Sequence, residues 1–260
     1  MTEGRLERIE TVLLDLDGTL YVGSQVVDGA PEAVRRLRDQ GLAVRFCTNT
    51  DSVTPSELAA RLTRRGFPVR EDELVTPVAV ATQLLGSDPE ARVLAVAAGG
   101  VRELLADRLA GPGEPITHVL VADPSYGAAY DDLDAAFRAL RDGAELLATQ
   151  VNRVAVRDDG EHLDTGGWVR LLEYATGATA RVLGKPSPEF FTAPLEALGR
   201  ASDTALVVGD DLEADIGGGS AVGAATVLVR TGKGDPPAGA GVEPDAVIDS
   251  VADLPDLLRR

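Results

Sequence analysis

Charged and polar side chains directly follow several apolar segments of this chain. The segments are TVLL, AVRFC, ARVLG and ALVVG, and the residues that follow them are Asp15 with Asp17, Thr48 with Asn49, Lys185, and Asp210 with Asp211. Ligands of open parallel sheets collect beyond the carboxyl ends of the strands. We therefore expect these side chains to lie together in one site.

The acidic members of this set suit a hard metal ion. Asp15, Asp17 and Asp210 offer oxygen ligands of the kind that Mg²⁺ takes, and Mg²⁺ in proteins usually keeps several waters and binds a substrate phosphate. With two histidines and one cysteine in the chain, no histidine or cysteine ligand set competes with them. The sequence therefore predicts a Mg²⁺ site.

The remaining members suit a phosphate group. The Thr48 hydroxyl, the Asn49 amide and the Lys185 charge can hold and neutralise phosphate oxygens. A carboxylate is a competent nucleophile toward phosphorus and forms an aspartyl-phosphate that water later cleaves. A second carboxylate nearby can protonate the leaving alkoxide and then activate that water. The set therefore indicates phosphoryl-transfer chemistry.

The elements that carry these residues alternate between strands and helices. The segment TVLLDLD is apolar without alternation, which is typical of a central parallel strand covered on both faces. A helix is predicted over residues 31–40 and another over 55–65, the second preceded by the capping box of Thr54 and Glu57. Because this rhythm continues along the chain, we expect an α/β fold with a largely parallel sheet.

Length and composition limit the functional classes. The 260 residues could form one large domain or two modest ones, and 42 acidic against 25 basic residues give a net charge of -17. That charge argues against nucleic acid or an anionic membrane as the main partner. The polar N-terminal segment lacks the apolar stretch of a secretory signal, and the lone Cys47 fits a reducing compartment. We expect a cytoplasmic protein without a membrane span.

Four motifs carry a resemblance to a known family. DLDGTL, FCTNT, GKP and GDDLEADI, in this order, resemble the four motifs of the haloacid dehalogenase superfamily of phosphatases. The insert between the second and third motifs resembles that of subfamily IIA, the NagD-like group with a C2-type cap. The resemblance covers nearly the whole chain. It implies a Rossmann-like three-layer core of residues 1–78 and 183–260, with a smaller α/β cap of residues 79–182 inserted into it.

The resemblance assigns separate roles to the first two acids. It implies that Asp15 is the nucleophile and a Mg²⁺ ligand, and that Asp17 is the general acid and base, with a backbone carbonyl that also binds the metal. The dehalogenases of the superfamily lack an acid at the position of Asp17, because a halide leaves without a proton, whereas the alkoxide of a phosphomonoester needs one. Hydrolysis of a C–O–P linkage is therefore favoured over dehalogenation.

The other roles concern phosphate and metal. The resemblance implies that Thr48 binds the phosphoryl group with Asn49 beside it, and that Lys185 stabilises the charge shared by nucleophile and phosphate. It also implies that Asp210 completes the metal site. The sequence leaves open which further acid supports the metal, or whether either merely caps a helix: the candidates are Asp215 and Asp211.

The predicted function is that of a Mg²⁺-dependent phosphatase acting on a small phosphorylated metabolite through an aspartyl-phosphate. Two alternatives are a phosphotransferase or mutase of the same superfamily and a non-catalytic phospholigand-binding protein, although no motif residue is lost. The resemblance also implies a homodimer formed through the caps. In the cap, ATQVN stands where many relatives read ATNxD, and DTGGW departs from the usual turn, so substrate specificity cannot be transferred. Trp168 is expected to pack in the core rather than to line a pocket.

Overall fold

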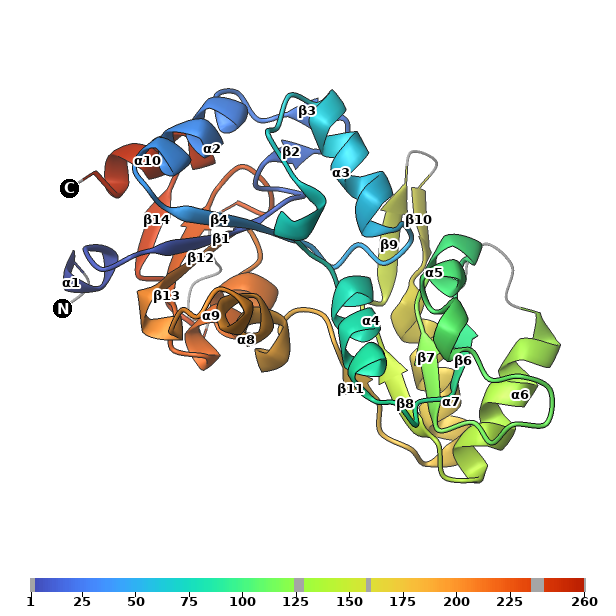
Figure 1. Ribbon diagram of the computed structural model, residues 1–260. Coiled ribbons are helices and arrows are strands. Elements are labelled where there is room, and N and C mark those ends of the chain that lie inside the picture. The colour runs from blue at the N-terminus through green and yellow to red at the C-terminus, as the bar shows by residue number, and fades with distance from the viewer. Residues whose placement is uncertain (1–2, 124–128, 158–159, 235–240, 260) are drawn as a thin grey trace. The chain divides into compact units, whose positions relative to one another are not determined.

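The computed structural model describes residues 3–123, 129–157, 160–234 and 241–259 (Figure 1). The chain divides into two compact units. The core unit comprises Met1–Thr48, Ser56–Val75 and Lys185–Arg260, and the cap unit comprises Asn49–Pro55 and Thr76–Gly184. Each unit is built around its own parallel sheet.

The core unit contains a six-stranded sheet in the order β14-β13-β12-β1-β4-β5, with every neighbouring pair parallel. Every residue of the three strands β1, β12 and β13 is buried, which explains their apolar sequences without alternation. The strands are β1 (Thr11–Asp15), β4 (Ala43–Cys47), β5 (Leu74–Val75), β12 (Ala205–Gly209), β13 (Ala225–Val229) and β14 (Ala246–Ile248). A small antiparallel hairpin follows β1 and consists of β2 (Tyr21–Val22) and β3 (Gln25–Val26).

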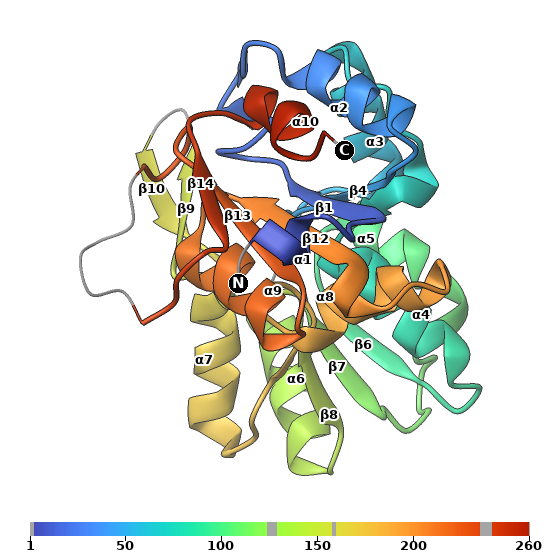
Figure 2. The same cartoon turned by 90° about the vertical axis from the view of Figure 1, so that its left-hand side faces the viewer.

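Helices cover both faces of the core sheet and give the unit three layers. In both views α2, α3 and α10 lie on one face, and α8 and α9 lie on the other (Figures 1 and 2). The helices are α1 (Glu3–Leu6), α2 (Ala30–Asp39), α3 (Pro55–Arg64), α8 (Pro188–Ala197), α9 (Gly218–Ala221) and α10 (Leu254–Leu257). A turn of π-helix, η5 (Leu212–Gly217), precedes α9.

One helix of the core unit contains an internal proline. Pro194 lies inside α8, and the helix continues through it to Ala197 instead of splitting there. A proline removes one hydrogen bond of a helix. The helix nevertheless persists because Phe190, Phe191 and Leu195 are buried and anchor its inner face.

The cap unit contains a four-stranded parallel sheet in the order β11-β8-β7-β6. Its strands are β6 (Val93–Val96), β7 (His118–Val121), β8 (Glu145–Ala148) and β11 (Arg181–Val182), with a separate antiparallel hairpin of β9 (Val154–Arg157) and β10 (Gly160–Leu163). Its helices are α4 (Pro77–Ser87), α5 (Gly99–Leu104), α6 (Tyr130–Arg141) and α7 (Thr165–Thr176). Both units are therefore α/β, as the sequence predicts.

Apolar side chains from helices and sheet form the core of the cap unit. One cluster joins α6 and α7 to β7 and β8 and includes Val119, Leu140 and Leu172; Trp168 packs against it, as expected. None of the helices in the described ranges combines the length and the apolar character that spanning a bilayer requires.

Candidate active site

The two acids of DLDGTL differ in their surroundings. Asp15 ends β1 and is only 6% exposed, whereas Asp17 is exposed two residues later. Leu16 between them is fully buried. One-residue spacing at the strand end therefore puts a buried apolar side chain between one buried acid and one exposed acid.

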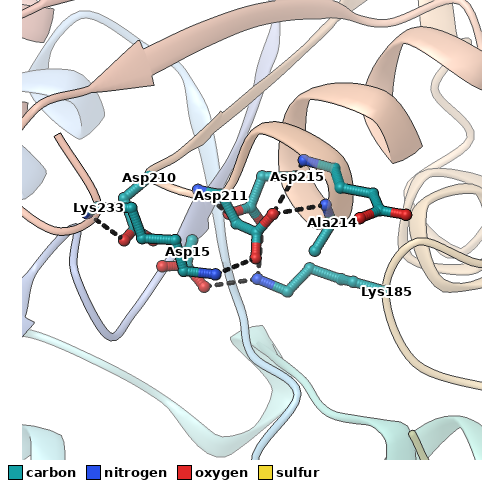
Figure 3. Close-up of polar contacts among 8 residues, drawn as sticks. Asp15, Lys185, Asp210, Asp211, Ala214, Asp215 and Lys233 are labelled. Carbon is teal, nitrogen blue, oxygen red and sulfur yellow. Dashed lines mark hydrogen bonds and ion pairs between the residues drawn. The ribbon is translucent and has the colours of Figure 1, made fainter. Parts of the chain in front are cut away.

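Lys185 joins Asp15 to an acid from another motif. Its Nζ donates hydrogen bonds to Asp15 Oδ1 at 2.5 Å and to Asp215 Oδ1 at 2.6 Å, and all three side chains are buried (Figure 3). Burial by itself would lower the pKa of Lys185, but the two carboxylates outweigh it and hold that pKa above its ordinary value. Lys185 therefore keeps its positive charge inside the protein.

The carboxylates of this cluster are crowded. Burial raises the pKa of Asp15 despite the opposing charge of Lys185, and it raises the pKa of Asp215 to about 7. Burial also raises the pKa of Asp210, and the charge of Asp215 adds to this effect. Each shift reports that negative charge is costly here. The cluster therefore favours any additional cation that can reach it.

The geometry of the cluster fits a hard divalent cation. Oxygen atoms of Asp15, Asp210 and Asp215 lie within 4.8 Å of one another. Asp15 Oδ2 is buried and receives no hydrogen bond from the described residues. A buried carboxylate oxygen without a donor is unfavourable unless a cation binds it, and a set of carboxylate oxygens is the donor type that Mg²⁺ prefers.

Glycines allow the backbone to approach this cluster. Gly18 has a φ of +88°, and a Cβ at that position would lie 2.3 Å from Asp210 Oδ2. A Cβ at Gly232 would lie 2.0 Å from the same oxygen. The glycine of DLDGTL is thus required both by its left-handed backbone and by the carboxylate against it.

Asp215 and Asp211, the two candidates for further metal support, have different surroundings in the structure. Asp215 belongs to the cluster of buried carboxylates, whereas Asp211 Oδ1 caps η5 by accepting hydrogen bonds from the backbone N–H groups of Glu213 and Ala214, both at 2.9 Å. Although burial opposes it, the hydrogen bonds from Ala214 and Lys233 hold the pKa of Asp211 below its usual range. The support of a metal by either acid remains a prediction.

Lys233 is a neighbour of the site that the motif analysis did not assign. Its backbone N–H donates to Asp210 Oδ2 at 2.9 Å, and its Nζ donates to Asp211 (Figure 3). The chain has only two lysines, and this scarcity was the available signal. Lys233 follows a strand at a longer distance than Lys185 does, so strand-end reasoning missed it.

Thr48 and Asn49 lie at the boundary between the two units. Thr48 is the last residue of the first core-unit segment, and Asn49 is the first residue of the cap unit. Strand pairing places Cys47 beside Asp15, so Thr48 follows the neighbour of the predicted nucleophile, and its side chain is buried. Burial raises the pKa of the Cys47 thiol, which argues against a reactive thiolate.

Gly184, directly before Lys185, allows a close approach of neighbouring segments. It lies at a bend, and Lys185 and Pro186 form a turn directly after it. A Cβ there would lie 2.4 Å from the carbonyl oxygen of Thr149 and 2.6 Å from Asn49 Oδ1. Gly184 is therefore needed because two segments that enter the cap unit pack against each other.

Asp51 is a buried acid that sequence reasoning missed. Its Oδ2 accepts hydrogen bonds from Thr149 Oγ1 at 2.6 Å, Thr165 Oγ1 at 2.9 Å and the backbone N–H of Asp123 at 3.1 Å. Burial raises its pKa, although these donors oppose the shift. The four residues lie far apart in the sequence, so no spacing could have shown this network.

The two departures in the cap sequence form one structural feature. Gln150 of ATQVN is buried, and its Nε2 donates to Asp164 Oδ1 of DTGGW at 2.7 Å. Asp164 also caps α7, because the same oxygen accepts from the backbone N–H of Thr165 at 2.8 Å. A Cβ at Gly166 would lie 2.3 Å from the Val151 carbonyl oxygen, so the two segments are in close contact.

Two family models match this chain. Residues 12–108 match a model described as haloacid dehalogenase-like hydrolase, and residues 182–254 match one described as HAD-hydrolase-like. The phospholysine phosphohistidine inorganic pyrophosphate phosphatase of Rattus norvegicus is 36% identical over 98% of this chain and 96% of its own length. The chain belongs to the haloacid dehalogenase-like hydrolases.

Solved structures agree with this assignment. A 4-nitrophenylphosphatase from Thermotoga maritima shares the fold with a TM-score of 0.89 at 24% identity, covering 97% of this chain and 98% of that one. A glycerol phosphate phosphatase from Mycobacterium tuberculosis, solved in complexes with calcium and with magnesium, is 30% identical with a TM-score of 0.84, covering 96% of this chain. The latter match covers 76% of that chain in the calcium complex. The α/β fold, membership of subfamily IIA and the assignment as a phosphatase are therefore confirmed.

Proposed function

We propose that this phosphatase is Mg²⁺-dependent and hydrolyses a small phosphorylated metabolite through an aspartyl-phosphate on Asp15. The observation that carries the proposal is the buried cluster in which Lys185 holds one oxygen of Asp15 while the other receives no hydrogen bond from the described residues. A carboxylate held in this way is oriented by one oxygen and keeps the other free to bind a cation or to react.

The metal would be held by carboxylate oxygens of Asp15, Asp210 and Asp215, together with the backbone carbonyl of Asp17 as the family resemblance implies. A bound Mg²⁺ would neutralise phosphate oxygens and so favour attack by an anion. The magnesium complex of the Mycobacterium tuberculosis phosphatase supports this choice of ion.

Asp15, Asp17 and Lys185 have separate roles in the two steps of the reaction. An oxygen of Asp15 attacks phosphorus in line, a new O–P bond forms, and the bond to the leaving oxygen breaks while Asp17 gives that oxygen a proton. Asp17 then takes a proton from the water that cleaves the aspartyl-phosphate. Lys185 keeps Asp15 oriented and offsets the negative charge that develops beside it.

Binding of the phosphoryl group is assigned to Thr48, with Asn49 beside it. Thr48 lies at the end of the strand that pairs with β1, one position beyond the neighbour of Asp15. The buried ammonium of Lys185 lies against Asp15 in the same unit. A hydroxyl donor and a fixed positive charge near the nucleophile suit a phosphate dianion.

The choice of substrate is assigned to the cap unit. The relatives are named for phospholysine, phosphohistidine and pyrophosphate in one case and for glycerol phosphate in the other. This chain differs from the common cap pattern at Gln150 and Asp164, which contact each other, so a change at one position affects the other. A panel of small phosphate esters and phosphoramidates is the direct way to find the substrate.

Hydrolysis of 4-nitrophenyl phosphate tests the mechanism. We expect activity with Mg²⁺, loss of activity with a chelator and recovery when Mg²⁺ is returned. Asp15→Asn should reduce kcat by at least about 10³-fold, because the nucleophile is removed while its size is kept. Activity that survives this substitution or the chelator would contradict the proposal. Transfer of phosphate to an acceptor without release of free phosphate would instead favour a phosphotransferase.

A further inference from the structure

The turn that carries Asp17 is closed by its own backbone. The Leu16 carbonyl accepts a hydrogen bond from the Leu20 N–H at 2.8 Å, and the Gly18 N–H donates to the Tyr21 carbonyl at 2.7 Å. Asp17 lies inside this turn with an exposed side chain. Its position is therefore set by the backbone of the turn and by whatever holds Tyr21.

An arginine from a distant part of the core unit holds that residue. Arg65 follows α3, and the central carbon of its guanidinium group lies 4.1 Å from the centroid of the Tyr21 ring. Its Nη2 donates a hydrogen bond to the carbonyl oxygen of Gly23 at 3.0 Å. Arg65 thus contacts both Tyr21 of strand β2 and the tip of the β2–β3 hairpin, which lies beside α3 (Figure 1).

This contact is well suited to fix a position. Tyr21 is 8% exposed, and a partly desolvated cation over an aromatic ring contributes more than an exposed pair does. The guanidinium group is planar, so it can stack on the ring and donate to a carbonyl at the same time. An isolated β-bridge pairs the backbone of Asp17 with that of Tyr21, so the two residues are direct neighbours. Burial and the charge of Asp17 raise the pKa of Tyr21 to about 12.

We propose that Arg65 is a positioning residue for Asp17, which it holds in place by clamping Tyr21 and Gly23 of the adjoining hairpin. The inference rests on the proposed function, in which Asp17 gives a proton to the leaving group. Loss of the clamp should weaken this proton transfer and leave attack by Asp15 intact, because Asp15 is held separately by Lys185.

Two esters of similar size distinguish these steps. Phenol is a weaker acid than 4-nitrophenol, so phenyl phosphate depends more on a general acid than 4-nitrophenyl phosphate does. The ratio of kcat/KM for phenyl phosphate to kcat/KM for 4-nitrophenyl phosphate reports this dependence and is independent of the later hydrolysis of the phosphoenzyme. Asp17→Asn provides the reference, and it should lower the ratio most.

Arg65→Met keeps much of the side-chain stem and removes the cation. We expect it to lower the ratio by about tenfold, a part of the roughly 10²–10⁴-fold that general acid catalysis contributes. Tyr21→Phe keeps the ring and should leave the ratio close to that of the unaltered protein, whereas Tyr21→Leu should lower it. Arg64→Met, at the exposed preceding position, is the matched control and should have no effect.

Equal losses on both esters, or no loss, in Arg65→Met would overturn the inference and leave the proposed function standing. Thermal unfolding of each variant shows whether an equal loss reflects a damaged fold. If the unaltered protein with Mg²⁺ hydrolyses neither ester, the proposed function fails first, and this inference fails with it.

Discussion

Lys185 is the residue on which the balance of charge in the site depends. It donates to two buried carboxylates, Asp15 and Asp215, and a third, Asp210, lies in the same cluster. Removing one partner from a buried ion pair usually costs more than the pair contributes, because the remaining charge is left buried without compensation. The effect of replacing Lys185 should therefore exceed that of replacing an exposed lysine.

We expect Lys185→Met to lower kcat/KM for 4-nitrophenyl phosphate by about 100-fold or more, in line with the loss of a preorganised charge in an active site. Lys185→Arg should recover little, because a planar guanidinium group cannot replace a compact ammonium between two carboxylates. Lys233→Met, which removes a largely exposed cation paired with Asp211, is the comparison variant and should lose less. Steady-state kinetics check this order, and similar losses in the two methionine variants would contradict it.

Asp51 connects several elements of the cap unit. It lies in the segment Asn49–Pro55, and its donors come from the end of β7, the end of β8 and the start of α7. All three hydrogen bonds end on one carboxylate oxygen. A buried network of this kind is costly to break in part, because each donor that loses its acceptor remains desolvated.

Asp51→Ala should lower the free energy of unfolding by about 3 kcal/mol, since it leaves buried donors without an acceptor. Asp51→Asn keeps an acceptor oxygen and should cost less. Chemical unfolding followed by the fluorescence of Trp168 measures both, because this single tryptophan packs in the core of the cap unit. Asp107→Ala, at an exposed position of the same unit, is the control; an equal loss there would contradict the expectation.

The difference in unfolding free energy between the unaltered protein and Asp51→Asn should depend on pH. Burial raises the pKa of Asp51 from 3.8, so the folded protein binds this proton more tightly than the unfolded chain does. The resulting stability is complete below pH of about 4 and is lost as pH rises through the folded pKa. The loss of unfolding free energy caused by Asp51→Asn should therefore become smaller as pH rises. A loss that grows with pH would contradict this expectation and would show that the hydrogen-bond donors stabilise the ionised carboxylate.

At the scale of the whole molecule, charge and metal are linked. The net charge of -17 includes a cluster of carboxylates whose pKa values are raised by burial. A ligand that binds only the folded state stabilises it by mass action. Binding of a divalent cation should therefore stabilise the fold as well as permit catalysis.

Mg²⁺ at about 100 times its Kd should raise the free energy of unfolding by about 2.7 kcal/mol, which calorimetry detects as a higher Tm. Asp210→Asn should lose most of this shift, because it removes one carboxylate of the cluster. The exposed Asp203→Asn should keep it. NaCl at equal ionic strength controls for screening of the acidic surface. An undiminished shift in Asp210→Asn would place the ion elsewhere.

The sequence by itself determined the α/β fold and the family. Central parallel strands are apolar on both faces and need helices between them, and these are local patterns that a single chain displays. Strand ends of the core sheet then locate Asp15 and Asp210, because the carboxyl edge of a parallel sheet gathers its ligand residues. Lys185 instead follows β11, a strand of the cap sheet, so only the tertiary structure shows that it lies against Asp15. The four motifs indicate the haloacid dehalogenase family.

Only the tertiary structure decided the contacts between distant segments. It placed Asp215 against Lys185 and Asp211 on a helical cap, although both acids follow the same strand. It also showed why Gly184 must be small, which groups donate hydrogen bonds to Asp51, and that Arg65 contacts Tyr21 and Gly23 of the hairpin after Asp17. These interactions depend on side-chain direction and on approach in space, and neither leaves a periodic or spaced pattern in the sequence.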